Sequence, residues 1–257
     1  MEMARFDLSD AEWAIIEPLL PNRPRGVARV DDRRVLNGIF YVLRTGSPWR
    51  DLPERYGPHT TVYNRFNRWA KAGVWLRVFE ALAARSPRSM ALIDSSIIRA
   101  HQHAAGAKKG GPDNAIGRSR GGLSTKINAV VDERGLPVRL ILSPGQQHDS
   151  RAAGALLADL RPGAVVIGDR AYDSNALLTL VADAGGQTCI PTPRYRKQQR
   201  VIDVELYRQR NPVERFFNKL KHFCRIAARY DKLASNFLAA VALAAIRLWT
   251  RNYESTT

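Results

Sequence analysis

The sequence predicts an α/β protein in which helices flank a mixed sheet, preceded by an all-α N-terminal domain of helix-turn-helix-like character. Apolar residues recur at helical spacing through the first 88 residues. From Met90 onwards, short apolar runs typical of buried strands alternate with amphipathic stretches typical of helices. We therefore expect two domains, a helical one over residues 1–88 and a mixed-sheet one over residues 89–257.

The composition predicts a soluble cytoplasmic protein with a polyanionic partner. Of the 257 residues, 45% are hydrophobic, which suffices for a sizeable core. Two cysteines are too few for a disulfide framework, and no apolar run has the length of a signal peptide or membrane span. The formal charge is +16, and 12 basic and 4 acidic side chains lie between Arg194 and Lys232. Such an excess favours nucleic acid, although a merely basic protein would show it too.

Two helices are expected at the start of the N-terminal domain. Ser9 and Glu12 have the spacing of a capping box, and the helix they begin ends at Pro21. Asp32 is expected to cap a second, largely buried helix over residues 33–44.

A third helix begins at Thr60 or Thr61, with an apolar side and a basic side. A short helix, a turn and a basic helix resemble a helix-turn-helix, so we expect Arg65 and Arg68 on the basic side to contact DNA. Such clusters also occur as plain packing modules, and this alternative stays open. The apolar side consists of Val62, Phe66 and Trp69.

The second domain is expected to follow the order of a ribonuclease H-like fold, with three strands, then helix, strand, helix, strand, helix. Residues 99–122 lack periodicity and are basic, and we expect a mobile loop there that orders on DNA. The expected strands cover residues 91–98, 127–131, 138–142, 164–167 and 188–190, and the expected helices cover residues 151–160, 175–184, 205–221 and 235–251.

Two aspartates stand out among the acids of this domain. Asp94 interrupts an apolar strand, where an ionised carboxylate is costly unless a cation compensates it. Asp169 directly follows another apolar strand, at the end where the sites of open sheets gather. Ordinary roles in turns or helix caps explain Asp132, Glu133, Asp149 and Asp173.

A third acid, Glu214, lies in a segment with four regularly spaced side chains. Tyr207, Arg210, Glu214 and Lys221 follow one another at steps of 3, 4 and 7 residues, which places them within about 60° on a helix. Pro212 lacks a backbone N–H, so the helix either kinks there or begins there with Asn211 as its cap. An apolar stripe runs beside them through Leu206, Val213, Phe217, Leu220 and Cys224.

Asp94, Asp169 and Glu214 are expected to converge in such a sheet. Three hard oxygen donors without His or Cys suit Mg²⁺ or Mn²⁺. Two such ions can activate an attacking oxygen and stabilise a leaving one at phosphorus. His148 could lie near this site, but a single His in a loop is more often structural.

The pattern Tyr-x2-Arg-x3-Glu-x6-Lys resembles the signature of bacterial insertion-sequence transposases of the DDE type, in particular insertion-sequence family 5. The segments 8–13, 46–53, 93–96, 117–126 and 168–173 resemble this family as well. Pro212 is less usual in the family's signature helix.

This resemblance implies a catalytic triad of Asp94, Asp169 and Glu214 that binds two Mg²⁺ or Mn²⁺ ions. It also implies that the enzyme cuts the ends of its element at terminal inverted repeats and joins the 3′-hydroxyls to target DNA. A homodimer or larger assembly on DNA, in the bacterial cytoplasm or nucleoid, is expected. The implied DNA contacts are Tyr207, Arg210 and Lys221, with Lys126 and Arg170 in the matching segments.

Two other hypotheses remain. A catalytically idle DNA-binding regulator derived from a transposase would bind DNA without cutting it. A ribonuclease H-fold nuclease such as a junction resolvase would cut DNA without joining it.

Overall fold

The computed structural model describes residues 4–21, 29–105 and 114–254. Its contacts define two compact units. The helical unit comprises residues 1–82, 102–107 and 220–257, and the sheet unit comprises residues 83–101 and 108–219. The last helices of the chain therefore group with the first ones, and the single division at residue 88 stays a prediction.

The helices of the helical unit start at recognisable caps. The hydroxyl of Ser9 accepts the N–H of Glu12 at 3.0 Å, and the Glu12 carboxylate accepts the N–H of Ser9 at 2.9 Å, which confirms the capping box. Asp31, and not Asp32, caps the second helix. The elements are α1 (Asp10–Ile16), η1 (Glu17–Leu19), α2 (Asp32–Thr45), η2 (Trp49–Asp51), η3 (Glu54–Tyr56), α3 (His59–Lys71), α4 (Val74–Ala83), α5 (Gln102–Ala105), α10 (Cys224–Ala227), β7 (Ala228–Arg229) and α11 (Ala234–Glu254).

The C-terminal helix α11 is the centre of this unit. A helix that is apolar on most sides must be covered on most sides. Helices α1, α2, α3 and α10 pack against it. Its most buried large side chains are Phe237, Val241, Leu243, Ile246 and Trp249, all at most 1% exposed.

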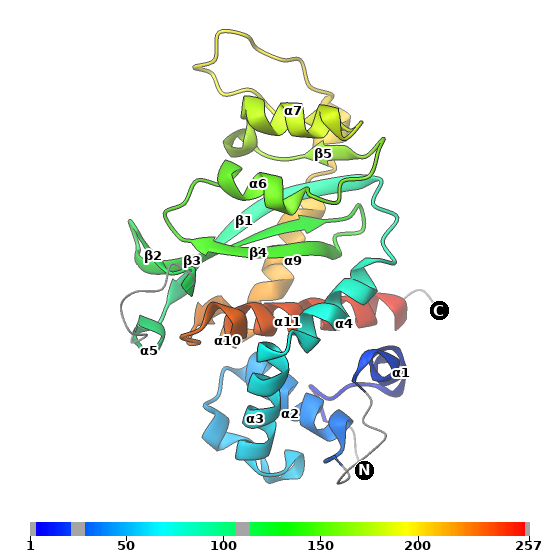
Figure 1. Cartoon of the computed structure of the whole chain (residues 1–257), viewed down its shortest axis with the longest axis vertical. Coiled ribbons are helices and arrows are strands. Elements are labelled where there is room, and N and C mark those ends of the chain that lie inside the picture. Colours follow the sequence, from blue (N-terminus) through cyan, green and yellow to red (C-terminus); the bar gives the residue numbers. More distant parts are fainter. Residues whose placement is uncertain (1–3, 22–28, 106–113, 255–257) are drawn as a thin grey trace. The chain divides into compact units, whose positions relative to one another are not determined.

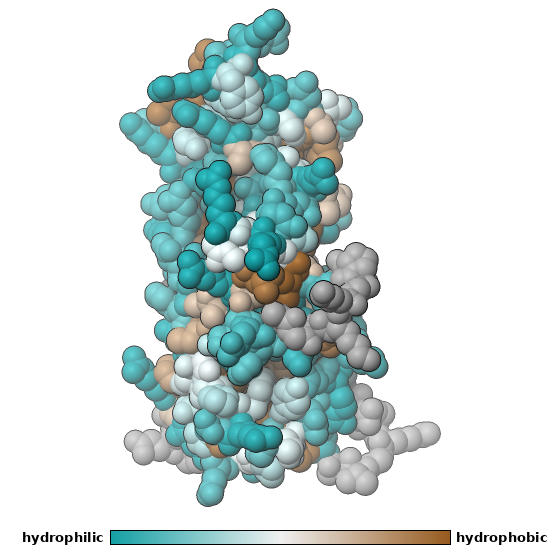
Figure 2. Space-filling view, turned by 90° about the vertical axis from the view of Figure 1, so that its left-hand side faces the viewer, coloured by the Kyte–Doolittle hydropathy of each residue, from teal (hydrophilic) through white to brown (hydrophobic). Residues whose placement is uncertain are grey.

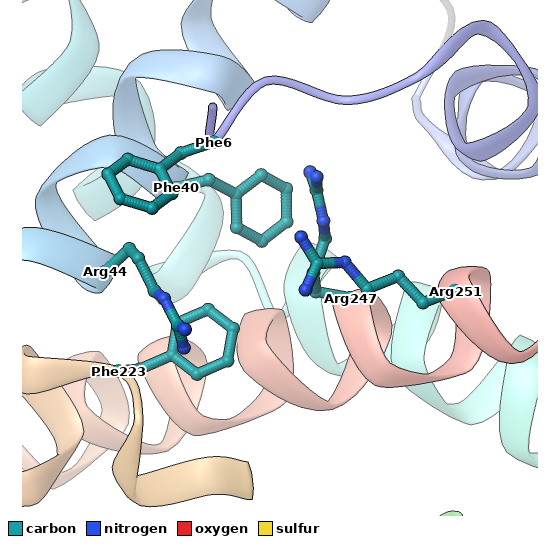
Figure 3. A pocket seen from close by; sticks show the side chains of 6 residues that line it. All are labelled: Phe6, Phe40, Arg44, Phe223, Arg247 and Arg251. Atoms are coloured by element: carbon teal, nitrogen blue, oxygen red, sulfur yellow. The ribbon is translucent and has the colours of Figure 1, made fainter. Parts of the chain in front are cut away.

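Arginines from α11 join this core through one buried acid. Glu12 in α1 is 2% exposed, and its Oε1 forms an ion pair with the Nε of Arg247 at 2.8 Å. The Nη2 of Arg247 donates to the carbonyl of Asp7 at 2.6 Å. Figure 3 shows the small pocket that Arg247 lines, together with three aromatic rings and two other arginines. Its lining consists of Phe6, Phe40, Arg44, Phe223, Arg247 and Arg251.

The sheet unit is built on one mixed sheet (Figure 1). The strands β4, β3 and β1 pair antiparallel, β1 pairs parallel with β5 and β5 with β6, and β2 pairs with the start of β3. The elements are β1 (Met90–Ala100), β2 (Gly117–Ser119), β3 (Gly122–Val131), β4 (Pro137–Pro144), α6 (Ser150–Leu156), β5 (Val165–Ile167), η5 (Arg170–Tyr172), α7 (Asn175–Asp183), β6 (Gln187–Cys189), α8 (Val204–Arg208) and α9 (Asn211–Lys221).

Helices cover both faces of this sheet. In Figure 1, α6 lies in front of the strands and α9 behind them. Ala91 and Ile93 of β1 belong to the core under α6 and α7. Because neighbouring strand residues point to opposite faces, Asp94 points away from that core. The mixed α/β fold of ribonuclease H-like type is therefore confirmed.

The expected loop over residues 99–122 is wrong at both ends. Strand β1 continues to Ala100, and β2 pairs with β3 through Gly117 and Ser119. Residues 106–113, the centre of the expected loop, lie outside the described part of the chain. So do residues 22–28, which belong to a segment rich in Pro, Arg and Gly, residues 21–30, that the sequence predicts to be a linker.

The surface carries no large apolar area in the view of Figure 2, where hydrophilic side chains dominate and apolar ones form small separate patches. Within the described part of the chain, no helix combines the length and the apolar character needed to cross a membrane.

Candidate active site

The signature segment forms two helices with a break between them. Helix α8 ends at Arg208 and α9 begins at Asn211, so a new helix begins beside Pro212, with Asn211 as its first residue and not as its cap. A proline in the first helical turn removes an N–H that would have no helical partner anyway. Tyr207 therefore lies in α8, Arg210 in the break and Glu214 in the first turn of α9.

The apolar side of α9 fixes where Glu214 points. Val213, Phe216, Phe217 and Leu220 are at most 6% exposed, whereas the Glu214 side chain is 56% exposed. Phe216 belongs to this buried side although the expected stripe omitted it. Cys224 was wrongly included, because α9 ends at Lys221 and Cys224 is exposed at the start of α10.

Arg210 connects two of the three acids. Its Nη2 lies 2.7 Å from Oδ2 of Asp94, and its Nη1 lies 2.6 Å from Oε1 of Glu214. The Arg210 side chain is only 15% exposed. Burial alone would lower the pKa of its guanidinium, but the charges around it raise that pKa instead. The groups responsible are Asp94, Tyr207, Glu214 and Asp169.

Asp94 carries a costly charge. Burial raises the pKa of its carboxyl, and the positive charge of Arg210 offsets part of that rise. The Ser95 N–H donates to Oδ1 of Asp94 at 2.8 Å and favours the ionised form. The nearby carboxylates of Asp169 and Asp149 oppose it, so the pKa of Asp94 is raised overall.

Asp169 lies at the matching position of the neighbouring strand. Leu92 of β1 pairs with Ile167 of the parallel strand β5, and each aspartate follows its strand's paired residue by two positions. The Asp169 Oδ1 accepts the N–H of Ala171 at 2.9 Å, which orients its carboxylate. The residue before Asp169 is Gly168. Because it has no side chain, the backbone there can approach the Ile93 side chain of β1 closely, where a Cβ would lie only 2.9 Å away.

Asp149 is a member of this cluster that the sequence interpretation missed. It was expected to cap the helix after it, yet its side chain makes no cap hydrogen bond. Its Oδ1 accepts the Ser95 hydroxyl at 2.7 Å and the Lys126 ammonium at 2.6 Å. Only its closeness to His148 in the sequence could have drawn attention to it. The His148 Nδ1 itself lies 2.8 Å from the Ser150 hydroxyl.

Asp173 is a second acid whose expected role is wrong. Ser174 caps α7, through its hydroxyl and the N–H of Leu177. Asp173 is buried and paired instead with Arg196 and Arg200.

The expected DNA contacts in the sheet unit differ in their exposure. Arg170 is exposed beside Asp169, and Tyr207 is half-buried beside Arg210. Lys126 is 8% exposed and engaged by Asp149, so its ammonium group does not face solvent freely. Lys221 is exposed at the end of α9 and belongs to the helical unit.

The two expected DNA contacts in α3 also differ. Arg65 is buried and forms an ion pair with Asp32, which corrects the expectation of an exposed side chain. Asp32 was expected to cap α2, and this pairing is its actual role. Arg68 is exposed and donates from Nε to the carbonyl of Asn64 at 3.4 Å.

The donor chemistry of the acid cluster fits a hard divalent ion, because its members offer carboxylate oxygens and neither sulfur nor imidazole. Among the residues that the structure describes, no three His, Cys, Asp or Glu side chains lie close enough together to form a ready metal site. Two of the acids hold the guanidinium of Arg210 instead. The position between Asp94 and Glu214 is thus occupied by the positive charge of Arg210.

Two family models together match most of the chain. The family described as "Putative transposase of IS4/5 family" matches residues 8–79. The family described as "Transposase DDE domain" matches residues 85–249 and so covers more than half of the chain.

Curated relatives of this chain include one named as a putative transposase and one named for an insertion element. A protein of Brucella ovis named "Putative transposase for insertion sequence element IS6501" is 39% identical over 130 residues, which are 50% of this chain and 100% of the relative. An uncharacterized protein y4sN of Sinorhizobium fredii is 40% identical over 104 residues, 40% of this chain and 83% of the relative. An uncharacterized 16.2 kDa protein of insertion element IS402 from Burkholderia cepacia is 42% identical over 112 residues, 38% of this chain and 76% of the relative. The chain therefore belongs to the insertion-sequence transposases with a DDE domain.

Proposed function

We propose that this transposase cleaves phosphodiester bonds at the ends of its own insertion sequence and joins the freed 3′-hydroxyls to target DNA. One observation carries this proposal. Arg210 contacts both Asp94 and Glu214, while Asp169 occupies the matching position on the strand beside Asp94. Two acids, from a strand and a helix, thus hold one cation, and the charge of a third acid at a strand end adds to the raised pKa of that cation.

Asp94, Asp169 and Glu214 would hold two Mg²⁺ or Mn²⁺ ions. When bound, such ions supply charge stabilisation for the attacking and leaving oxygens of an in-line displacement at phosphorus. The chain supplies the orientation of the donors. The Ala171 N–H holds Asp169, and the Ser95 N–H holds Asp94.

The basic side chains around the acids would hold the DNA strand. Guanidinium groups match the geometry of phosphate oxygens and can donate to two of them at once. Arg210 is placed between the acids, and Arg170 is exposed beside Asp169. We assign phosphate contacts to both, and to Tyr207 and Lys221. Water is the first nucleophile in this proposal and the 3′-hydroxyl is the second.

The proposed partners follow from this reaction. The enzyme would recognise the terminal inverted repeats of its element through the N-terminal helical region, residues 1–88, and hold two ends together as a homodimer or larger assembly. Residues 89–257 would form the catalytic domain. Its place of action would be the bacterial cytoplasm, where the DNA lies.

The direct test is Mg²⁺-dependent cleavage of a duplex that carries the element's own end, with wild type and Asp169→Ala compared. Cleavage by wild type alone, leaving a 3′-hydroxyl, followed by joining of that end to a second duplex, is the expected result. DNA binding without cleavage in Mg²⁺ and in Mn²⁺ would instead identify an idle regulator. Cleavage without joining would identify a nuclease.

A further inference from the structure

A basic hollow of about 520 Å³ lies in the helical unit, at one side of α3 and α4. Four of its lining side chains are arginines, and one is an aromatic ring. They come from the segment before α2, from α3 and from α4. These residues are Arg29, Arg65, Arg68, Trp69 and Arg77.

In the inner wall of this hollow, two guanidinium groups stack on one indole ring. The Arg65 guanidinium lies 4.9 Å from the centre of the Trp69 ring, and the Arg29 guanidinium lies 5.3 Å from the same ring. Both arginines also form ion pairs with Asp32. The Arg65 side chain is 5% exposed and Asp32 is 13% exposed. One carboxylate thus serves two cations, and Arg65 supports the wall from inside.

Two further guanidinium groups complete the hollow without a carboxylate. Arg68 in α3 donates from Nε to the Asn64 carbonyl at 3.4 Å. Arg77 in α4 donates from Nη1 to the Ala72 carbonyl at 2.7 Å. In the described part of the chain, neither forms an ion pair with an acid. The hollow therefore holds four guanidinium groups against the one carboxylate of Asp32, an excess that favours an anion.

The geometry favours phosphate over a base edge. A phosphodiester presents oxygens in a tetrahedral arrangement and can accept from arginines on two different helices at once. A base edge presents its acceptors in one plane, usually to the fork of a single arginine. The carbonyl bonds of Arg68 and Arg77 hold these side chains at the hollow in the absence of any partner.

We propose that this hollow binds backbone phosphates of DNA through Arg68 and Arg77, and that Arg65 supports it as a positioning residue. This proposal rests on the proposed function, since it takes DNA as the partner. It predicts that the hollow anchors DNA of any sequence and that the reading of bases occurs elsewhere. Arg77 thereby joins Arg68 as a proposed DNA contact, and Arg65 is no longer one.

The test is DNA binding by fluorescence anisotropy in EDTA, where no cleavage can occur. The probes are a duplex with the element's end and a duplex of scrambled sequence, each titrated over a range of salt. The variants are Arg68→Gln, Arg77→Gln and the double variant. The matched control is Arg50→Gln, which removes an equal charge from an exposed position in η2 of the same unit. Melting curves confirm that each variant is folded.

Each single variant should weaken binding to both duplexes by the same factor, about 5- to 10-fold near 0.15 M salt. The slope of log K against log salt should fall by about 1 for each arginine and by about 2 for the double variant. Arg50→Gln should leave the slope unchanged. Arg65→Gln should instead lower the melting temperature, and Arg65→Lys should restore part of it without changing the slope.

Unchanged slopes in Arg68→Gln and Arg77→Gln would overturn the proposal. Weakening confined to the duplex with the element's end would overturn it too, because that result would mean base recognition. An equal effect of Arg50→Gln would show a general charge effect and no site. Cleavage at saturating DNA tests the active site separately, so failure of the hollow and failure of the proposed reaction give different results.

Discussion

Arg210 is the residue at which the charges of the acid cluster are balanced. It makes charge-assisted hydrogen bonds to Asp94 and Glu214 at 2.7 and 2.6 Å. A divalent ion held by Asp94 and Glu214 would share these carboxylates with the guanidinium. The guanidinium and the ion therefore compete, and displacement of Arg210 towards a DNA phosphate would couple metal binding to substrate binding.

Arg210→Gln should therefore tighten the binding of Mn²⁺ to the DNA-free protein by about tenfold, or ~1.4 kcal/mol, because the competing cation is gone. Calorimetry or the electron paramagnetic resonance of free Mn²⁺ measures this. Arg208→Gln is the control, since Arg208 pairs with Glu205. Weaker Mn²⁺ binding in Arg210→Gln would show that Arg210 organises the acids and does not compete for them.

Tyr56 gives the helical unit a sensitivity to alkaline pH. Its hydroxyl donates to Asp7 at 2.8 Å, and burial and this bond raise its pKa to about 12 from the ordinary 10.0. As the pH rises, the unfolded chain loses the Tyr56 proton before the folded chain does. The stability contributed by Tyr56 is therefore complete below pH 10.0 and is lost as the pH rises towards about 12.

Urea unfolding at pH 9 and pH 11 should show a smaller decrease in the free energy of unfolding between the two pH values for Tyr56→Phe than for wild type. Equal losses, or the same change in Tyr63→Phe at an exposed position, would contradict this.

Single residues show where the sequence was informative. Asp94 and Asp169 could be singled out because a carboxylate in or directly after an apolar strand is conspicuous. Asp149 could not, because its partners Ser95 and Lys126 are 54 and 23 residues away and only the folded sheet brings them together. The burial of Arg65 could not be predicted for the same reason, because its partner Asp32 lies on another helix.

At the scale of elements, apolar runs and turn residues predicted the strands β1, β3, β4, β5 and β6 and the helices that follow them. The break before α9 was one of two alternatives that Pro212 allowed. Strand β2 could not be predicted, because its three residues are Gly117–Ser119, which carry no apolar signal and are fixed only by pairing with β3. Helix α5 is likewise too short for a periodic pattern.

The turn between β3 and β4 fixes the start of α9. Gly135 has φ +78°, and a Cβ there would lie 3.2 Å from both Cβ and the carbonyl oxygen of Pro212, two residues before Glu214. Gly163 has φ +79° with nothing within 4 Å of such a Cβ, so it is a matched control. Alanine at either position costs about 1 kcal/mol for the left-handed backbone.

Gly135→Ala should therefore lower the free energy of unfolding by about 1–2 kcal/mol more than Gly163→Ala, and it should reduce cleavage because Glu214 is displaced. Urea unfolding and the cleavage assay measure the two effects. Equal losses in both variants would mean that the contact between the turn and Pro212 does not position α9.

At the scale of the whole molecule, the helical unit is assembled from both ends of the chain. The buried pair of Glu12 and Arg247 joins α1 to α11, and α11 supplies many of the fully buried side chains of the unit. The sequence showed the apolar character of α11 but gave no sign of which unit it would join, because an all-round apolar helix fits any core.

A fragment of residues 1–88 should therefore not fold by itself. It lacks α10 and α11, and the apolar sides of α1, α2 and α3 that face α11 would be exposed. Circular dichroism and urea titration should show no cooperative transition, whereas the full chain should show one. A cooperative transition in the fragment would mean that the predicted boundary at residue 88 is a true domain boundary.

In the proposed reaction, Asp94, Asp169 and Glu214 carry out phosphoryl transfer on DNA. The most direct measurement compares wild type, Glu214→Gln and Glu205→Gln on a duplex with the element's end in Mg²⁺. Glu205 lies in α8 with a side chain 78% exposed. Glu214→Gln should cut at least about 10³-fold more slowly, or ~4 kcal/mol in activation free energy, with DNA affinity nearly unchanged, while Glu205→Gln should cut like wild type. Cleavage by Glu214→Gln at the wild-type rate would contradict the assignment of the active site.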